Sequence, residues 1–317
     1  MGRYVAKRLG LMFMSLLIIT FMCFVLVRML PPAELPIGDP HTAVIEARRE
    51  AAGYNKPYVT QFVIFLKDIF TKWDWGVSDV LYFGQDVVKI FTSKLPPTMI
   101  VNFYSIIGSI PIGIIFGIIA ALKKNTWLDH TISTLTMVCI SVPSFVYAFL
   151  IQYFLSYKLG WLPFLMKSGT DFFSWPMFVS MIPAIISLSL GTIAGYTRTT
   201  RAELTEVLTS EFMLLARTKG LTKAQATVRH AMKNCMVVIL PGIMGAFVGT
   251  MSGSLIIEKI FAIPGIGSLY LNSINGRDYP IFMFYTVFYI SIGLIMGIVV
   301  DISYGFIDPR IRMGSRK

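Results

Sequence analysis

Six long apolar runs divide the chain, and polar stretches separate them. Each run holds about 20 to 25 residues, which is the length an α-helix needs to cross the hydrocarbon core of a bilayer. The pattern therefore predicts an all-α polytopic membrane protein with six transmembrane helices. The expected spans cover residues of about 9–28, 99–121, 131–155, 177–197, 236–257 and 281–301.

The first run resembles a signal peptide in one respect only. Arg3, Lys7 and Arg8 precede it, as basic residues precede the apolar part of a signal peptide. Its apolar length of about 19 residues is too great for a signal peptide, and MLPP follows it where a cleavage site would have small residues. We therefore expect a retained span.

Small residues recur at helical spacing within the runs. Gly245, Gly249 and Gly253 lie four residues apart, which predicts one smooth stripe along the fifth span. Such stripes let helix backbones approach closely, so helix packing is the expected role and a pathway wall is the alternative. The same spacing recurs in the second and sixth spans, at Gly113, Gly117, Gly293 and Gly297. Kinks are expected where proline interrupts spans two to five, at Pro111, Pro143, Pro183 and Pro241.

The polar stretch between the fourth and fifth runs has the pattern of two short helices. Residues 211–234 read EFMLLARTKGLTKAQATVRHAMKN. Thr209 or Ser210 can cap the first helix, and Gly220 can end it. Thr222 and Gln225 then fit a capping box for a second helix that leads into the fifth span.

One face of the first short helix is apolar and could dock on a partner. Phe212, Leu215 and Ala216 share this face in a helical arrangement. Three interpretations remain open: a solvated loop, a DNA-binding helix-turn-helix, or a docking element for a cytoplasmic partner. The DNA interpretation is weak, because expected membrane spans tether the segment on both sides.

The stretch 29–98 after the first run is long and polar. Its middle part, GYNKPYVTQFVIFLKDIF, is amphipathic. We expect a small, partly helical cap there, which is either a connecting loop or a docking surface. The expected apolar face consists of Val59, Phe62, Val63, Leu66 and Ile69.

Charge is scarce, and its placement predicts the topology. Charged residues make up 14% of the 317 residues, whereas soluble domains hold about 25%. With the N-terminus inside, the inner segments have a net charge of about +10 and the outer segments about +1 of the total +11. Both termini are therefore expected in the cytoplasm, with residues 29–98 outside. No nucleic acid is needed to explain the basic balance.

The expected span cores contain no Asp, Glu, Lys, Arg or His, and Arg28 and Asp301 lie at span ends, where side chains can reach the interface. Carriers driven by a proton gradient use such groups inside the membrane, and hydrolases need a nucleophile with its base or metal ligands. We therefore expect neither kind of chemistry, no metal site and no catalytic residue in this chain. The polar groups that remain as candidates for a pathway are Asn102, Ser141, Ser187, Ser189 and Thr192.

Several motifs, in order along the chain, resemble the oligopeptide and dipeptide permeases of ABC importers. The spacing Glu211-x4-Ala216-x3-Gly220 resembles the EAA motif that precedes the penultimate span of such permeases. The further matching stretches are LPIGDP, GYNKP, KLPPTM, SVPSF, EKIFAIPGIGSLYLNSINGRDYP and DPRIR. Together they resemble the first permease of each pair, which carries the large outer loop. Through the EAA motif, the resemblance implies ATPase-coupling roles for Glu211, Phe212, Leu215, Ala216, Arg217, Lys219 and Gly220.

Some positions depart from the family pattern. Phe212 and Met213 stand where the general EAA motif has two alanines, and the later Ile-x-Leu-Pro is not at its expected distance. Val237 stands where the family often has proline soon after the asparagine equivalent to Asn234. These changes leave the docking role in place and affect the details of the loop.

The resemblance implies a type I ABC importer permease fold. Implied partners are a second homologous permease, two cytoplasmic ATPases that hold ATP and Mg, an extracellular solute-binding protein and the bilayer of a bacterial cell membrane. No cofactor is expected in this chain, which lacks a G-x4-G-K-[ST] string. The implied solute is a peptide, with nickel, glutathione or oligosaccharide as alternatives, and a stand-alone channel or membrane scaffold is the alternative from another class.

The same considerations divide the chain into four parts. They are an inner tip with the first span (1–28), the outer segment (29–98), a permease core (99–305) that includes the coupling segment (198–235), and a basic tail (306–317).

Overall fold

The computed structural model describes residues 2–33 and 41–307. Two of the motifs that carry the family resemblance, LPIGDP and DPRIR, lie outside the described residues. So does nearly all of the predicted tail.

Helices make up almost all of the described secondary structure, and one antiparallel bridge joins Val77 to Asp86. The helices are α1 (Gly2–Met29), α2 (Thr42–Ala51), α3 (Tyr58–Lys72), α4 (Val87–Leu122), α5 (Trp127–Ser141), α6 (Ser144–Ile151), α7 (Trp175–Leu208), α8 (Glu211–Thr218), α9 (Lys223–Ala226), α10 (Met232–Gly249), α11 (Leu255–Ile260), α12 (Ile266–Asn275) and α13 (Tyr279–Ile307). π-Helical turns cover Gln152–Lys158 and Thr227–Ala231, and a 3-10 turn covers Thr250–Ser252.

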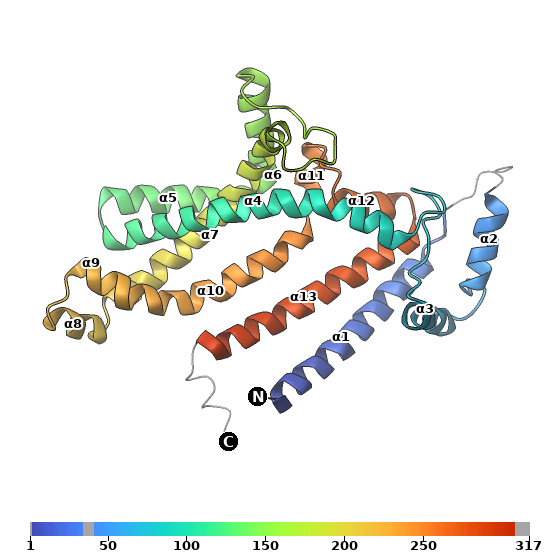
Figure 1. Ribbon diagram of the computed structural model, residues 1–317, viewed down its shortest axis with the longest axis horizontal. Helices are drawn as coiled ribbons and strands as arrows, with labels where there is room; N and C mark the ends of the chain where they lie inside the picture. The colour runs from blue at the N-terminus through green and yellow to red at the C-terminus, as the bar shows by residue number, and fades with distance from the viewer. Residues whose placement is uncertain (1, 34–40, 308–317) are drawn as a thin grey trace. The chain divides into compact units, whose positions relative to one another are not determined.

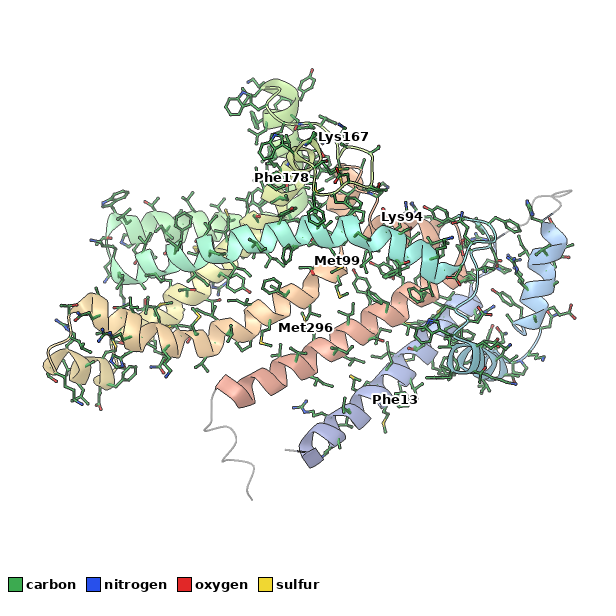
Figure 2. The ribbon with its side chains drawn as sticks, viewed as in Figure 1. Phe13, Lys94, Met99, Lys167, Phe178 and Met296 are labelled. Atoms are coloured by element: carbon green, nitrogen blue, oxygen red, sulfur yellow. The ribbon has the colours of Figure 1, made fainter. Side chains whose placement is uncertain are left out.

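Five of these helical segments are long and apolar enough to cross a membrane, and a bent pair forms a sixth. The five contain α1, α4, α7, α10 and α13, and the pair is α5 with α6 (Figure 1). Exposed apolar side chains lie along α1 from Leu9 to Met29, among them Phe13, which is half exposed and labelled in Figure 2. The predicted all-α polytopic architecture is confirmed, with a change in its third and fifth spans.

The third expected span, about 131–155, is not one continuous helix. Its two segments, Trp127–Ser141 and Ser144–Lys158, are bent by 99° where they meet. Pro143 causes the break, because its ring holds Val142 in an extended conformation (φ −91°, ψ 125°) and proline has no N–H for a helical hydrogen bond. A kink was expected here, whereas the helix stops. The other three span prolines lie inside α4, α7 and α10.

The fifth span ends earlier than its apolar pattern predicts. α10 stops at Gly249, a 3-10 turn follows, and Gly253 has a φ of +47° before α11 begins. The positive φ is a conformation that glycine adopts without steric cost. Gly253 therefore does not continue the helical stripe of Gly245 and Gly249, and the predicted three-residue stripe is wrong on this point.

Residues 1–96 and 264–298 form one compact unit. Within it α1 packs on α3, with the rings of Phe24 and Phe62 5.4 Å apart. Phe62 and Ile69 of the predicted α3 face are buried, but Val59 and Val63 are exposed. The buried face of α3 is therefore rotated from the predicted one, and it includes Gln61. The Gln61 side-chain amide donates to the carbonyl of Lys56 at 2.8 Å. Hydrogen bonding thus admits a polar residue to the interior.

A buried carboxylate holds two distant loops of this unit together. Asp278 lies just before α13 and is fully buried. Its Oδ2 accepts hydrogen bonds from Ser78 Oγ (2.5 Å) and from the N–H groups of Leu81 (3.0 Å) and Val80 (3.2 Å). Such charge-assisted bonds are stronger than neutral ones, so they fix the loop after α3 against the start of α13.

Residues 97–263 and 299–307 form the described part of the second unit, in which α4 and α7 approach closely. A Cβ added at Gly117 would lie 2.5 Å from Thr200 Cβ, and one at Gly113 would lie 2.7 Å from the carbonyl oxygen of Ile193. The Thr197 hydroxyl donates to the Gly113 carbonyl at 3.1 Å. The small-residue packing predicted for this pair is confirmed.

An ion pair fixes α5 to α7 at Arg201, the residue after Thr200 of the α4 contact. Arg201 donates to Asp129 twice, from Nε to Oδ1 at 2.5 Å and from the second guanidinium nitrogen to Oδ2 at 2.9 Å. The Asp129 side chain is 1% exposed, and the N–H of Asn125 also donates to it at 3.0 Å. This bidentate ion pair holds α5 and α7 together.

The α4–α7 contact predicts the effect of a single methyl group. Gly117→Ala forces the helices apart, and overpacking of this kind costs roughly 1–3 kcal/mol. We expect a lower melting temperature for the detergent-purified complex. Gly293→Ala is the matched control, since its Cβ would meet no described atom within 4 Å. Equal melting temperatures for the two variants would contradict the close contact.

Candidate coupling segment and pathway

α8 begins and ends close to where the sequence predicts. Ser210 holds the N-cap position with an extended backbone (φ −74°, ψ 154°), but its hydroxyl donates to the carbonyl of Val207 and does not cap the helix. Gly220 has a φ of +91°, and its N–H donates to the carbonyl of Arg217 at 3.0 Å. This left-handed conformation after the helix end favours glycine.

The predicted capping box is present at the start of α9. The N–H of Thr222 donates to Gln225 Oε1 at 3.1 Å, and the N–H of Gln225 donates to Thr222 Oγ1 at 3.2 Å. Each bond satisfies a backbone donor that the first helical turn leaves free. The chain then runs through the π-helical turn into α10, as expected.

One face of α8 is buried against its own chain. Met213 is 3% exposed and Ala216 is 7% exposed, and both pack in a cluster with Leu204 of α7 and Cys235 of α10. Ala216 therefore does not lie on an exposed face with Phe212 and Leu215, and the predicted grouping is wrong on this point. The reason is the three-residue spacing of Met213 and Ala216, which puts them on one side of the helix.

The opposite face of α8 is apolar and exposed. Phe212, Leu214 and Leu215 are 42%, 64% and 56% exposed. Leu214 was not predicted, although it is the most exposed of the three. The charged residues with implied coupling roles are also exposed, and they are Glu211, Arg217 and Lys219. An exposed apolar surface with a charged rim is typical of a protein interaction site.

α8 is joined closely to two long apolar helices (Figure 1). Only Thr209 and Ser210 separate it from α7. Its buried face shares a cluster with Leu204 of α7 and with Cys235 and Ile239 of α10. A displacement of α8 is therefore passed to both helices through packed side chains.

The predicted pathway residues are largely engaged in helix contacts. Asn102 donates from Nδ2 to the carbonyl of Thr250 at 3.0 Å, which ties α4 to the turn after α10. The hydroxyls of Ser189 and Ser105 lie 3.1 Å apart and join α7 to α4. Ser187 is fully buried.

Two further predicted pathway hydroxyls bond within α7. The Ser187 hydroxyl donates to the carbonyl oxygen of Pro183 at 2.7 Å, and the Thr192 hydroxyl donates to the carbonyl oxygen of Leu188 at 3.3 Å. Ser141 is exposed at the break after α5, and Gly245 and Gly249 lie on α10. A Cβ added at Gly249 would meet no described atom within 4 Å, so no close helix contact forms at Gly249 among the described residues. The pathway role of these residues stays a prediction.

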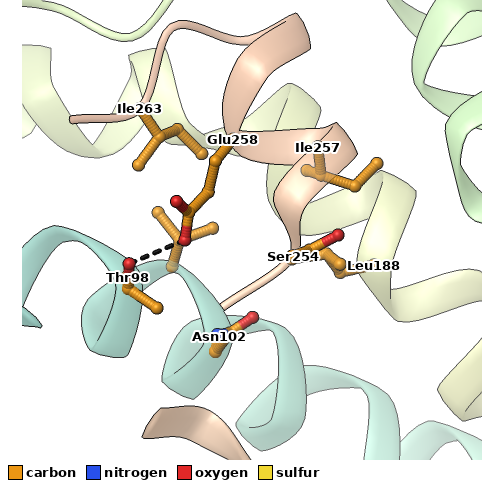
Figure 3. A pocket seen from close by; sticks show the side chains of 8 residues that line it. Thr98, Asn102, Leu188, Ser254, Ile257, Glu258 and Ile263 are labelled. Carbon is orange, nitrogen blue, oxygen red and sulfur yellow. Dashed lines mark hydrogen bonds between the residues drawn. The ribbon is translucent and has the colours of Figure 1, made fainter. Parts of the chain in front are cut away.

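A buried acid lies just beyond the expected end of the fifth span. Glu258 is 3% exposed and accepts a hydrogen bond from Thr98 Oγ1 at 2.7 Å (Figure 3). The pair borders a cavity of about 10 Å³ that Asn102 and Ser254 also line, which is the space of roughly one water molecule. The expected span stopped at residue 257, so the sequence reading missed Glu258. The only signal was an acid at the start of EKIFAIPGIG.

Known proteins resemble this chain over its full length. It is 34% identical to the dipeptide transport system permease protein DppB of Lactococcus lactis subsp. cremoris over 99% of this chain and 100% of that protein. The DppB of Bacillus subtilis is 33% identical, with 99% of each chain covered. The glutathione transport system permease protein GsiC of Shigella flexneri is 34% identical, over 98% of this chain and 99% of that protein.

Two solved structures share the fold. One is an amino acid ABC transporter, with a TM-score of 0.51 and 18% identity over 68% of this chain and 94% of the other. The second is a methionine ABC transporter in inward-facing conformations, with a TM-score of 0.52 and 15% identity over 72% of this chain and 98% of the other. These likenesses confirm the expected type I importer permease fold.

The family model of the binding-protein-dependent transport system inner membrane component matches residues 113–313, which include α8 and most of the apolar helices. The full-length relatives agree with it. The chain therefore belongs to the family of inner membrane components of binding-protein-dependent transport systems.

Proposed function

We propose that this chain is one of two homologous permease subunits of an ATP-driven importer for short peptides. An extracellular binding protein delivers the peptide, and two cytoplasmic ATPases bind ATP and Mg beneath the membrane. No cofactor and no catalytic residue resides in this chain. The observation that carries the proposal is α8, a short helix with an exposed apolar face that lies between two long apolar helices.

The exposed face of α8 supports a coupling role. Burial of an apolar side chain such as that of Leu215 stabilises a contact by about 1.5–3 kcal/mol. The apolar face would be buried against an ATPase, and it consists of Phe212, Leu214 and Leu215. Polar contacts at its edge would come from Arg217 and Lys219. When the ATPase pair closes, α8 moves and carries α7 and α10 with it.

The names of the relatives support a peptide as the solute. The two DppB proteins are named for dipeptide transport, and GsiC is named for glutathione transport. Glutathione is itself a tripeptide, so the three names share a chemical class. Nickel and oligosaccharide remain the alternatives outside this class.

The distribution of Lys and Arg supports the orientation. The inner side would hold 16 of the 28 basic residues, among them those of the coupling segment 198–235. This arrangement puts both termini and α8 in the cytoplasm, where the ATPases are. It leaves residues 29–98 outside, where a binding protein docks.

The first test of the proposed function is the energy source for uptake. We expect proteoliposomes that hold the complex, with binding protein outside and ATP on the ATPase side, to take up labelled dialanine. Uptake should persist when a protonophore collapses the proton gradient, because the expected span cores carry no Asp, Glu, Lys, Arg or His. Uptake driven by an imposed pH gradient without ATP would contradict the proposal.

Two controls complete the uptake test. In the first control, uptake of labelled dialanine is measured with an excess of unlabelled dialanine, glutathione, nickel or maltotriose. Inhibition by one of the last three, without inhibition by dialanine, would reveal an alternative solute. Purification of the tagged chain should also bring down a second permease and two ATPases. A chain that purifies alone and passes solute without ATP would be a stand-alone channel.

The second test addresses the exposed face of α8. Leu215→Gln removes apolar contact without touching the fold, since the side chain is 56% exposed. We expect the ATPase stimulation by loaded binding protein to fall about tenfold or more, which corresponds to the loss of one buried apolar side chain. Val228→Gln is the matched control, because Val228 is 71% exposed in the same segment but outside α8. Parent-like stimulation in Leu215→Gln would show that α8 is a solvated loop.

A further inference from the structure

A cavity of about 430 Å³ lies within the unit formed by residues 1–96 and 264–298. The end of α1, helices α2 and α3, the loop after α3 and the start of α13 line it. Its size falls in the range of small-molecule binding sites, which is about 300–1,000 Å³.

Three arginines converge on the cavity. The guanidinium carbon of Arg28 lies 3.6 Å from the ring centroid of Tyr54. Arg49 donates to the carbonyl of Ala33 at 3.1 Å, and one nitrogen of Arg48 lies 3.6 Å from Asp79 Oδ1. Arginine is the side chain best suited to bind a carboxylate, because its planar fork can donate two parallel hydrogen bonds.

Each of these arginines has a buried nitrogen without a hydrogen-bond acceptor among the described residues. The nitrogens are one terminal nitrogen each of Arg28 and Arg48 and the Nε of Arg49. A buried donor without an acceptor costs free energy, and a buried cation without an anion costs more. Arg48 has Asp79 at ion-pair distance, so the second cost applies to Arg28 and Arg49, which have no ion pair with a described residue. An anionic ligand would supply the missing acceptors.

Three acids line the cavity, Asp68, Asp74 and Asp79. Asp68 pairs with Lys72 at 2.9 Å, whereas Asp79 lies within ion-pair distance of Arg48. Asp79 Oδ1 is buried and accepts no hydrogen bond from a described residue. Burial, and after it the nearby carboxylate of Asp278, raises the pKa of Asp79, so a further cation beside it would be favourable. The lining holds the three guanidinium groups and Lys72 against the three carboxylates, which leaves an excess of one positive charge. The site therefore offers acceptors for one ammonium group and donors for a carboxylate.

The rest of the wall is apolar and aromatic. Phe24, Phe65 and Trp75 line it, and the rings of Phe65 and Trp75 meet edge to face at 6.3 Å. Aromatic walls with a few placed polar groups are typical of sites that bind small organic ligands. A ligand with an apolar side chain and two charged ends matches this lining.

We propose that this cavity binds a short peptide, with its C-terminal carboxylate held by Arg28 and Arg49 and its ammonium group beside Asp79. Trp75 and Phe65 contact the peptide side chains. The permease then has its own recognition site in the predicted outer part of the chain, apart from the binding protein. The choice of a peptide as occupant rests on the proposed function, whereas the carboxylate site rests on the arginines alone.

The test measures binding without the binding protein. Isothermal titration calorimetry on the full complex in nanodiscs uses alanyl-phenylalanine and its C-terminal amide as probes. We expect the free acid to bind and the amide to bind at least about tenfold more weakly, because the amide cannot accept a charge-assisted bidentate pair.

Variants locate the binding. Arg28→Gln should weaken alanyl-phenylalanine binding about tenfold, because it removes a guanidinium donor to the carboxylate. The melting temperature is recorded beside it, because the Arg28 guanidinium also stacks on Tyr54. Lys67→Gln is the matched control. It removes an exposed positive charge from α3, and Lys67 does not line the cavity. Parent-like binding in Lys67→Gln, with weak binding in Arg28→Gln, supports the site.

Several outcomes would overturn this inference. Equal affinity for the acid and the amide, unaltered binding in Arg28→Gln, or no heat with millimolar peptide would each do so. Arg28→Gln that binds peptide normally but loses stimulation by the binding protein would reassign the arginines to a protein contact. Uptake separates the two proposals. Normal ATP-driven peptide uptake without this binding removes only the cavity site, and binding without uptake removes only the proposed solute.

Discussion

The close approach of α4 and α7 at Gly113 and Gly117 is the contact on which the second unit depends. Lipid tails are as apolar as leucine, so helices in a bilayer associate through close packing and hydrogen bonds. The missing side chains let α7 lie directly on α4, and Thr197 adds a hydrogen bond to the Gly113 carbonyl. With the Asp129–Arg201 pair at its other neighbour, α7 is held on two sides.

The contacts that hold α7 on two sides matter for α8, because α8 packs against α7. Two residues connect the helices, and Met213 and Ala216 fix the inner face of α8 to Leu204 and Cys235. In the proposed function, a force on the exposed face would reach α7 and α10 through these packed side chains. ATP-driven transport needs such a link, because in this account the chemistry occurs on another chain.

Local chemistry made some elements predictable from the sequence. The spans followed from apolar length, and Gly220, Thr222 and Gln225 marked the ends of α8 and α9 correctly. Tertiary packing decided the rest. The buried face of α8 and the rotated face of α3 depend on which neighbours the helices meet, and α3 is turned so that Gln61 lies inside.

Other features lacked a signal because they join distant residues. Proline predicted a kink at Pro143, but only the whole fold decides that the chain turns by 99° there. The apolar pattern around Gly253 fits both a continuous helix and a helix that ends before Gly253, so the pattern did not show where α10 ends. Arg28, Arg48 and Asp79 come from three separate segments, so their convergence could not be read from spacing.

The most direct test of the account is the accessibility of residue 215 to a water-soluble maleimide. Leu215→Cys is made in a chain whose three native cysteines, Cys23, Cys139 and Cys235, are replaced by alanine. The account predicts rapid labelling of the chain alone, since Leu215 is 56% exposed, and strong protection once the ATPases are bound. Equally rapid labelling in a transporting, assembled complex would contradict the claim that α8 couples the permease to its ATPases.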